Sequence, residues 1–161
     1  MAEPAQKKAK VAVNAGHVVE SAVIPGKMDH VWELIKSMSF KFSKTVVEAK
    51  ADADAGSSIF NHMVSIAYSD NTVQTVRVSE ISERLANTRS IGMEFVSSDP
   101  PIGYAARMDL ITLRAVTHGD AAATFIEYSS DFSSDATLEH LEDSKFKKRE
   151  FFDDLASFVG K

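Results

Sequence analysis

The stretch Ile24-Pro25-Gly26-Lys27-Met28-Asp29-His30-Val31-Trp32-Glu33-Leu34-Ile35-Lys36 predicts a strand that ends at a proline and leads directly into a helix. Proline fixes φ and has no N–H to donate, so Pro25 suits the junction between the two elements. After it, apolar residues recur at spacings of three and four, which is the period of one helical face. That face carries the only tryptophan of the chain and consists of Met28, Val31, Trp32, Ile35 and Met38.

The segments on either side of this stretch predict one antiparallel sheet and a closing helix. Residues 37–43 are expected to form either a second helical turn or a loop. Clusters of Gly, Pro, Asp and Asn divide the chain from Thr45 to Phe132 into hairpins. Apolar residues then recur with helical spacing over residues 139–159, and Gly160 suits the end of that helix. The expected strands span residues 17–25, 45–51, 58–69, 72–82, 88–97, 104–116 and 122–132.

Length and composition predict a single globular domain. The chain has 161 residues, of which 44% are hydrophobic and 25% are charged. A chain of this size buries enough surface to form a core without disulfides or metals. We expect a flexible N-terminal tail at residues 1–16 and one domain at residues 17–161. The net charge of −5 argues against a nucleic-acid partner, because such a partner needs a basic surface.

Several classes of site lack the residues that they require. There is no cysteine, so disulfides, thiol nucleophiles and thiolate metal sites are excluded. The five histidines do not take metal-ligand spacing, and the aspartates near Gly56 lack the later ligands of a calcium loop. No apolar run is long enough to cross a bilayer, and residues 1–10 lack the core of a signal peptide. We therefore expect no metal, no cofactor and no stable membrane insertion, in a cytoplasmic protein that is a monomer or a weak homodimer.

The order of strand, proline, helix, hairpins and long closing helix resembles the helix-grip fold of the START/Bet v 1-like (SRPBCC) superfamily. The resemblance covers residues 18–159. It implies an α+β fold in which a curved antiparallel β-sheet of about six or seven strands wraps around a long C-terminal α-helix, with short helices after the first strand. The motifs that carry it are Ile24-Pro25 followed by Val31-Trp32, Tyr68-Ser69-Asp70-Asn71, Glu83-Arg84-Leu85, Glu127-Tyr128 through Phe132, and the closing segment from Phe151 to Val159.

The resemblance also implies a function, because this superfamily is known for internal hydrophobic cavities. We expect binding of a hydrophobic or amphipathic small-molecule ligand, such as a lipid, for transport, storage or sensing. The alternative is a polyketide cyclase- or dehydratase-like enzyme that uses the same cavity, with His62 or Tyr128 as acid or base. A third possibility is a closed core that acts through protein partners. The turns at residues 69–72 and 83–87 lack the glycine-rich or proline-bearing gate of the plant hormone receptors.

Alternation within the strands predicts which side chains face the cavity. In residues 58–69 the more apolar face carries Phe60, His62, Val64, Ile66 and Tyr68. The facing strand has two possible registers, and a slip of one residue turns every side chain to the other face. A two-residue turn at Asp70-Asn71 would align Val73, Thr75, Arg77, Ser79 and Ile81 with that face. A three-residue turn that includes Thr72 would align Gln74, Val76, Val78 and Glu80.

The second register gives the more apolar inner face and sets His62 opposite Glu80. Such a pair could orient a ligand hydroxyl or act as a general base, and the alternative is a hydrogen-bonded core histidine beside a solvated glutamate. Tyr104 and Tyr128 offer hydroxyl groups as polar anchors in an apolar pocket. The strand arginines expected on the convex, solvated face are Arg77, Arg89, Arg107 and Arg114. The alternative is that a buried arginine among them is an anchor for an acidic ligand. The predicted cavity-lining residues are Phe60, His62, Val64, Tyr68, Glu80, Met93, Phe95, Tyr104, Met108, Tyr128, Phe132, Lys148, Phe151, Phe152 and Leu155.

Overall fold

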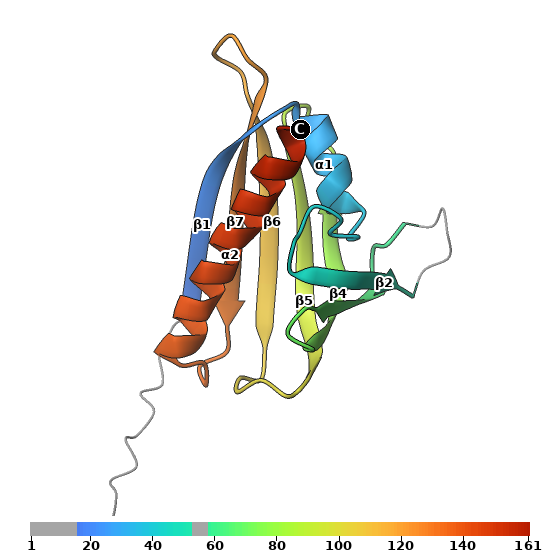
Figure 1. Ribbon diagram of the computed structural model, residues 1–161, viewed down its shortest axis with the longest axis vertical. Helices are drawn as coiled ribbons and strands as arrows, with labels where there is room; N and C mark the ends of the chain where they lie inside the picture. Colours follow the sequence, from blue (N-terminus) through green and yellow to red (C-terminus); the bar gives the residue numbers. More distant parts are fainter. Residues whose placement is uncertain (1–15, 53–57) are drawn as a thin grey trace, which may run out of the picture.

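The computed structural model describes residues 16–52 and 58–161, which form a curved seven-stranded antiparallel sheet and two helices (Figure 1). The predicted tail up to residue 15 and the predicted turn at residues 53–57 lie outside the described residues. The elements are β1 (Gly16–Pro25), α1 (Met28–Lys36), β2 (Val46–Ala51), β3 (Met63–Tyr68), β4 (Val73–Ser82), β5 (Thr88–Asp99), β6 (Arg107–Val116), β7 (Ala123–Phe132) and α2 (Leu138–Val159). The strand order is β1-β7-β6-β5-β4-β3-β2, and the predicted helix-grip fold is confirmed.

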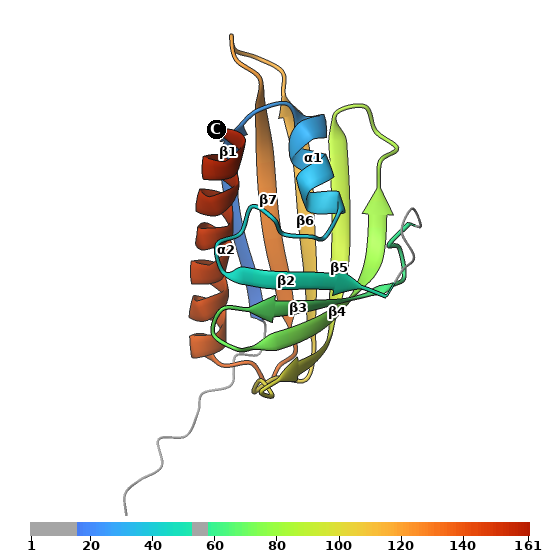
Figure 2. The same cartoon turned by 45° about the vertical axis from the view of Figure 1, so that its right-hand side comes forward.

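The sheet bends toward the two helices, which lie on the same side of it (Figures 1 and 2). The long helix α2 packs beside β1, and the shorter α1 contacts β6 and β7. Figure 2 shows β2 and β3 crossing the lower parts of β6 and β7, so the sheet partly encloses the space in front of it. None of the described helices is both long and apolar enough to span a bilayer. The largest side chains buried between these layers include Ile24, Ile35, Ile91, Ile111, Leu113, Ile126 and Leu155.

The stretch that joins β1 to α1 folds as the sequence predicts. The apolar stripe of α1 is buried, and Trp32 is only 2% exposed. The indole Nε1 of Trp32 donates a hydrogen bond to Glu83 Oε1 at 2.8 Å, which satisfies its one polar atom. Residues 37–43 form a loop instead of a second helical turn. Met38 and Phe40 have φ values of 52° and 50°, which a right-handed helix does not allow.

The β3–β4 hairpin closes through the three residues 69–71, and the Tyr68 N–H donates to the carbonyl of Thr72 at 2.8 Å. The second predicted register has a turn at residues 70–72, so the observed pairing of β3 with β4 differs from it by two residues. Because side chains alternate with a period of two, the same side chains of β4 still face inward. Because of this shift, His62 pairs with Val78 and not with Glu80. The buried inner residues of β4 are Gln74, Val76 and Val78.

The junction at Gly26 packs closely against the end of α2. Gly26 has a φ of 136°, and a Cβ atom there would lie 2.8 Å from Val159 Cγ1. Gly119 has a similar φ of 126° but nothing within 4 Å of the corresponding position. Both Gly→Ala substitutions introduce the same kind of backbone strain, and only Gly26→Ala adds a steric overlap. We expect Gly26→Ala to lower the free energy of unfolding by about 1–3 kcal/mol more than Gly119→Ala in urea denaturation. Equal losses would contradict close packing at this junction.

Candidate ligand-binding cavity

A cavity of about 360 Å³ lies between α2, the loop before β2 and the inner faces of β3 to β7. Its wall has two parts, a group of aromatic and aliphatic side chains and a chain of charged and polar ones. The exposed members of the lining belong to the β3–β4 turn and to α2, and they mark the mouth of the cavity. These residues are Ser69, Asp70, Asp143 and Lys147.

Arg107 and Asp109 form a buried ion pair on the inner face of β6. The distance from Arg107 Nε to Asp109 Oδ2 is 2.9 Å, and the two side chains are 14% and 4% exposed. The other guanidinium nitrogens donate to the Tyr104 hydroxyl at 2.6 Å and to Gln74 Oε1 at 3.3 Å. Burial lowers the pKa of Arg107, but the Asp109 carboxylate, together with Tyr104 and Tyr128, outweighs that effect and holds the pKa above its ordinary value. The guanidinium therefore stays charged.

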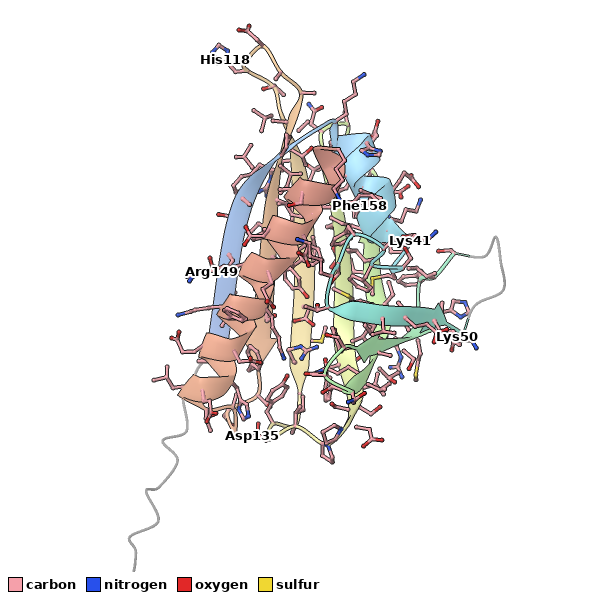
Figure 3. All side chains as sticks on the ribbon, viewed as in Figure 1. Lys41, Lys50, His118, Asp135, Arg149 and Phe158 are labelled. Atoms are coloured by element: carbon pink, nitrogen blue, oxygen red, sulfur yellow. The ribbon has the colours of Figure 1, made fainter. Side chains whose placement is uncertain are left out.

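Lys148 reaches the same cluster from α2, and only 4% of the residue is exposed. Its ammonium donates to Ser130 Oγ at 2.6 Å and to Ser144 Oγ at 2.8 Å. Ser130 in turn donates to Asp109 Oδ1, so one hydroxyl group links the ammonium to the carboxylate. The Lys148 nitrogen also lies 4.3 Å from the centre of the Tyr128 ring, within the range of a cation–π interaction. By contrast, Figure 3 shows Arg149 on the outer side of α2, where it pairs with Glu20 at 3.3 Å.

Burial changes the protonation equilibria of the cavity wall. It lowers the pKa of Lys148 to about 8, although the Asp109 carboxylate partly offsets this effect. Burial also raises the pKa of Tyr68 and Tyr104 and raises that of Tyr128 well above its ordinary value. At neutral pH the wall therefore offers two cationic groups and three protonated phenol groups, all of which can donate hydrogen bonds.

Aromatic rings pack edge to face around this polar chain. The ring centres of Tyr128 and Phe151 are 5.2 Å apart, at an interplanar angle of 85°. Tyr104 packs in the same manner against Phe132 and His140, each at 5.0 Å. Because Phe151 and His140 belong to α2 and the others to the sheet side, these contacts set the width of the cavity.

Seven of the fifteen predicted site residues line the cavity, and four others are buried in the core or pack against a lining residue. Val64, Phe152 and Leu155 are buried in the core, and Phe95 lies behind the wall with its ring centre 5.2 Å from the Arg107 guanidinium. Contact of any of these residues with a ligand stays a prediction. The predicted residues that line the cavity are Tyr68, Met93, Tyr104, Tyr128, Phe132, Lys148 and Phe151.

Phe60 and Met108 do not face the cavity, and their predicted placement is wrong. Phe60 is 54% exposed, because β3 begins only at Met63 and the alternation of that strand does not extend back to Phe60. Met108 is 46% exposed. On β6 the inward positions are the odd-numbered ones, occupied first by Arg107 and Asp109, so Met108 points outward.

The predicted pairing of His62 with Glu80 is also wrong. His62 lies outside the cavity lining, with Nδ1 at 3.0 Å from Asp52 Oδ1. Glu80 accepts a hydrogen bond from Ser90 Oγ at 3.1 Å. The β4–β5 register shifts between Val78 and Glu80, and such a bulge re-aims the side chains that follow it. Glu80 is therefore exposed, although Val78 is fully buried.

The cavity residues that the sequence does not predict are polar side chains on inward positions, chiefly Arg107, Asp109 and Ser130. Arg107 was expected on the convex face, yet its side chain is only 14% exposed, and that of Arg89 is only 17% exposed. A signal was present in β6, because Arg107 and Asp109 share one face with the apolar positions 111 and 113. A face that changes from charged to apolar along one strand is typical of a cavity with a polar end.

Asp109→Asn would leave the buried Arg107 guanidinium without its counter-ion. We expect this change to lower the free energy of unfolding by about 3–5 kcal/mol, the usual effect of breaking a buried ion pair. The matched control is Asp131→Asn, because Asp131 pairs with His17 on the surface and its side chain is 69% exposed. That control should change the stability by about 0–1 kcal/mol. Urea denaturation at pH 7 measures both values, and losses of similar size would contradict the importance of the buried pair.

The comparisons with known proteins concern the fold. No protein-family model matches the chain, and no curated protein matches it at a significant level. A solved structure of a protein from Nitrosospira multiformis has a TM-score of 0.72 and 20% identity, and the match covers 88% of this chain and 94% of that one.

Two further solved structures with a similar fold belong to proteins of a named kind. A START superfamily protein from Mycobacterium smegmatis has a TM-score of 0.69 and 8% identity, over 89% of this chain and 97% of that one. Ara h 8.0201, a Bet v 1-type allergen, has a TM-score of 0.69 and 13% identity, over 90% of this chain and 97% of that one. Identities this low show a shared fold and nothing finer. The chain therefore has the START/Bet v 1-like helix-grip fold.

Proposed function

We propose that the protein binds a small amphipathic molecule in the cavity between α2 and the sheet. The observation that carries this proposal is a volume of about 360 Å³ whose wall combines aromatic rings with a few convergent polar groups. Pockets of this size and composition are the usual sites for small molecules in proteins. The same volume argues against a closed core that acts only through protein partners. Transport, storage and sensing all require such binding.

The size of the cavity limits the ligand. A water-sized group occupies roughly 30 Å³, so a cavity of about 360 Å³ has room for on the order of a dozen such groups. This favours a molecule with one short chain or a few rings over a lipid with two long acyl chains. Burial of about 300 Å² of apolar ligand surface would contribute about 7 kcal/mol. The loss of translational and rotational freedom of the ligand offsets several kcal/mol of this binding free energy. We therefore expect a dissociation constant in the micromolar range or weaker.

The enzymatic alternative, a polyketide cyclase- or dehydratase-like activity, has less support. His62, one of its two acid or base candidates, does not line the cavity. Tyr128 lines the cavity, but burial raises its pKa well above the ordinary value. At neutral pH its hydroxyl is therefore a hydrogen-bond donor and not a base. That role suits the orientation of an oxygen atom on a bound ligand.

A matched pair of tryptophan variants tests whether the cavity is the binding site. Thr72 lines the cavity, whereas its neighbour Val73 is 39% exposed and is not part of the lining. Thr72→Trp should fill part of the cavity, and Val73→Trp should leave it open. We expect the dissociation constant for the neutral dye N-phenyl-1-naphthylamine to rise at least tenfold in Thr72→Trp and less than twofold in Val73→Trp. Dye fluorescence measures binding, and circular dichroism checks that both variants fold. Unchanged binding in Thr72→Trp would show that the dye binds elsewhere.

A further inference from the structure

Among the residues that the structure describes, the ammonium group of Lys148 is buried without a direct counter-ion. In the described part of the chain, no carboxylate lies within ion-pair distance of its Nζ atom, whose polar contacts are the hydroxyls of Ser130 and Ser144. The carboxylate of Asp109 reaches it only through Ser130 and is already paired with Arg107. Buried charges in proteins are normally paired, because desolvation of an isolated charge is unfavourable by several kcal/mol. This lysine therefore lacks the negative partner that its burial calls for.

The charges inside the cavity do not balance. From residues 16–52 and 58–161, its interior contains two cationic side chains, Arg107 and Lys148, and one carboxylate, Asp109, so one positive charge is in excess. The remaining charged lining residues lie at or near the mouth, where water and salt screen them. They are Asp70, Asp143, Lys147 and Glu150, of which only Glu150 is partly buried.

We propose that Lys148 is the anchor for the carboxylate of a short-chain amphipathic acid. This inference rests on the proposed function, since it names the head group of the cavity ligand. A carboxylate carries one negative charge, which matches the one excess positive charge of the interior. A phosphate monoester carries about 1.5 to 2 negative charges at pH 7 and would leave the interior negative. The ammonium has three N–H groups, of which two bind serine hydroxyls, so the third can donate to a carboxylate oxygen while the Tyr128 ring stays beside the nitrogen.

The surroundings of Lys148 suit both ends of such a ligand. The phenol group of Tyr68 lines the same cavity and keeps its proton at neutral pH, so it is a second donor for the head group. The rings of Tyr128, Phe151 and Phe132 form the apolar wall against which a chain can pack. Asp109 has a positioning role, because it holds the Arg107 guanidinium and leaves Lys148 as the cation that a ligand can pair with.

A matched series of ten-carbon ligands tests the proposal on the full chain. Decanoate, decanol and decylammonium each have ten carbon atoms in one unbranched chain, and their head groups are negative, neutral and positive. Isothermal titration calorimetry at pH 7 should show decanoate binding at least tenfold more tightly than decanol, and decylammonium binding more weakly than both. Equal affinities for the three would overturn the anchor while the proposed function survives. A preference for decylammonium would also overturn it. Failure of all three to bind would overturn the proposed function and the anchor with it.

Substitution of the lysine identifies the anchor. Lys148→Met keeps the length and apolar character of the side chain and removes the charge. We expect it to reduce decanoate affinity at least tenfold while decanol affinity changes less than threefold. The control is Lys145→Met, because Lys145 is also on α2 but pairs with Glu142 on the surface, outside the cavity lining. Retention of the preference for decanoate in Lys148→Met would overturn the proposal.

The pH dependence of the unmodified protein gives a test that needs no variant to fold. The pKa of Lys148 is lowered to about 8, so its charge is present below pH 8 and is lost as the pH rises above that value. Decanoate affinity should fall by up to tenfold per pH unit above pH 8, whereas decanol affinity should stay constant. Decanoate affinity that is flat to pH 10 would overturn the proposal. The charged groups that act on the ammonium are Asp109 and Arg107 on β6, Glu20 on β1 and Lys147 on α2, and the titratable Tyr128 on β7 lies beside it.

Discussion

Desolvation of the Asp109 carboxylate is the constraint on which the cavity wall depends. Asp109 is 5% exposed, and it accepts hydrogen bonds from Arg107 on its own strand and from Ser130 on β7. The Ser130 hydroxyl also accepts a hydrogen bond from Lys148, so the hydrogen bonds that begin at Asp109 connect β6, β7 and α2. A buried carboxylate without these donors would be strongly unfavourable. The chain therefore holds a cluster of charges where an ordinary core would hold apolar side chains, and the space beside that cluster remains open.

The fold was predictable because it depends on patterns that are local in the sequence. The spacing of Val31, Trp32 and Ile35 follows the helical period, and all three residues are at most 2% exposed. Proline and the turn residues mark where the elements end. The distant partners of these residues were not predictable. The hydrogen bond from Trp32 to Glu83 joins residues 51 positions apart, and no local pattern indicates it.

The candidate site was only partly predictable, because alternation assigns polar residues to the solvent side of a strand. That rule fails at a polar cavity: Arg107 and Asp109 face inward, while the apolar Met108 and Leu110 face outward and are 46% and 36% exposed. Aromatic and aliphatic lining residues such as Tyr128 were found, since they obey the rule. The placement of Glu80 depends on a bulge between β4 and β5, which leaves no distinct mark in the sequence.

The excess positive charge inside the cavity has the opposite sign to the protein as a whole, which carries a net charge of −5. The long-range field of the molecule would therefore repel the proposed anionic ligand during diffusional approach, and the short-range field of the interior would hold that ligand once it has entered. Salt screens the first effect much more than the second, because the interior charges are shielded from bulk ions. For the proposed acidic ligand, moderate ionic strength should thus speed arrival more than it weakens retention, so the surface charges would set the association rate and the interior charges the selectivity.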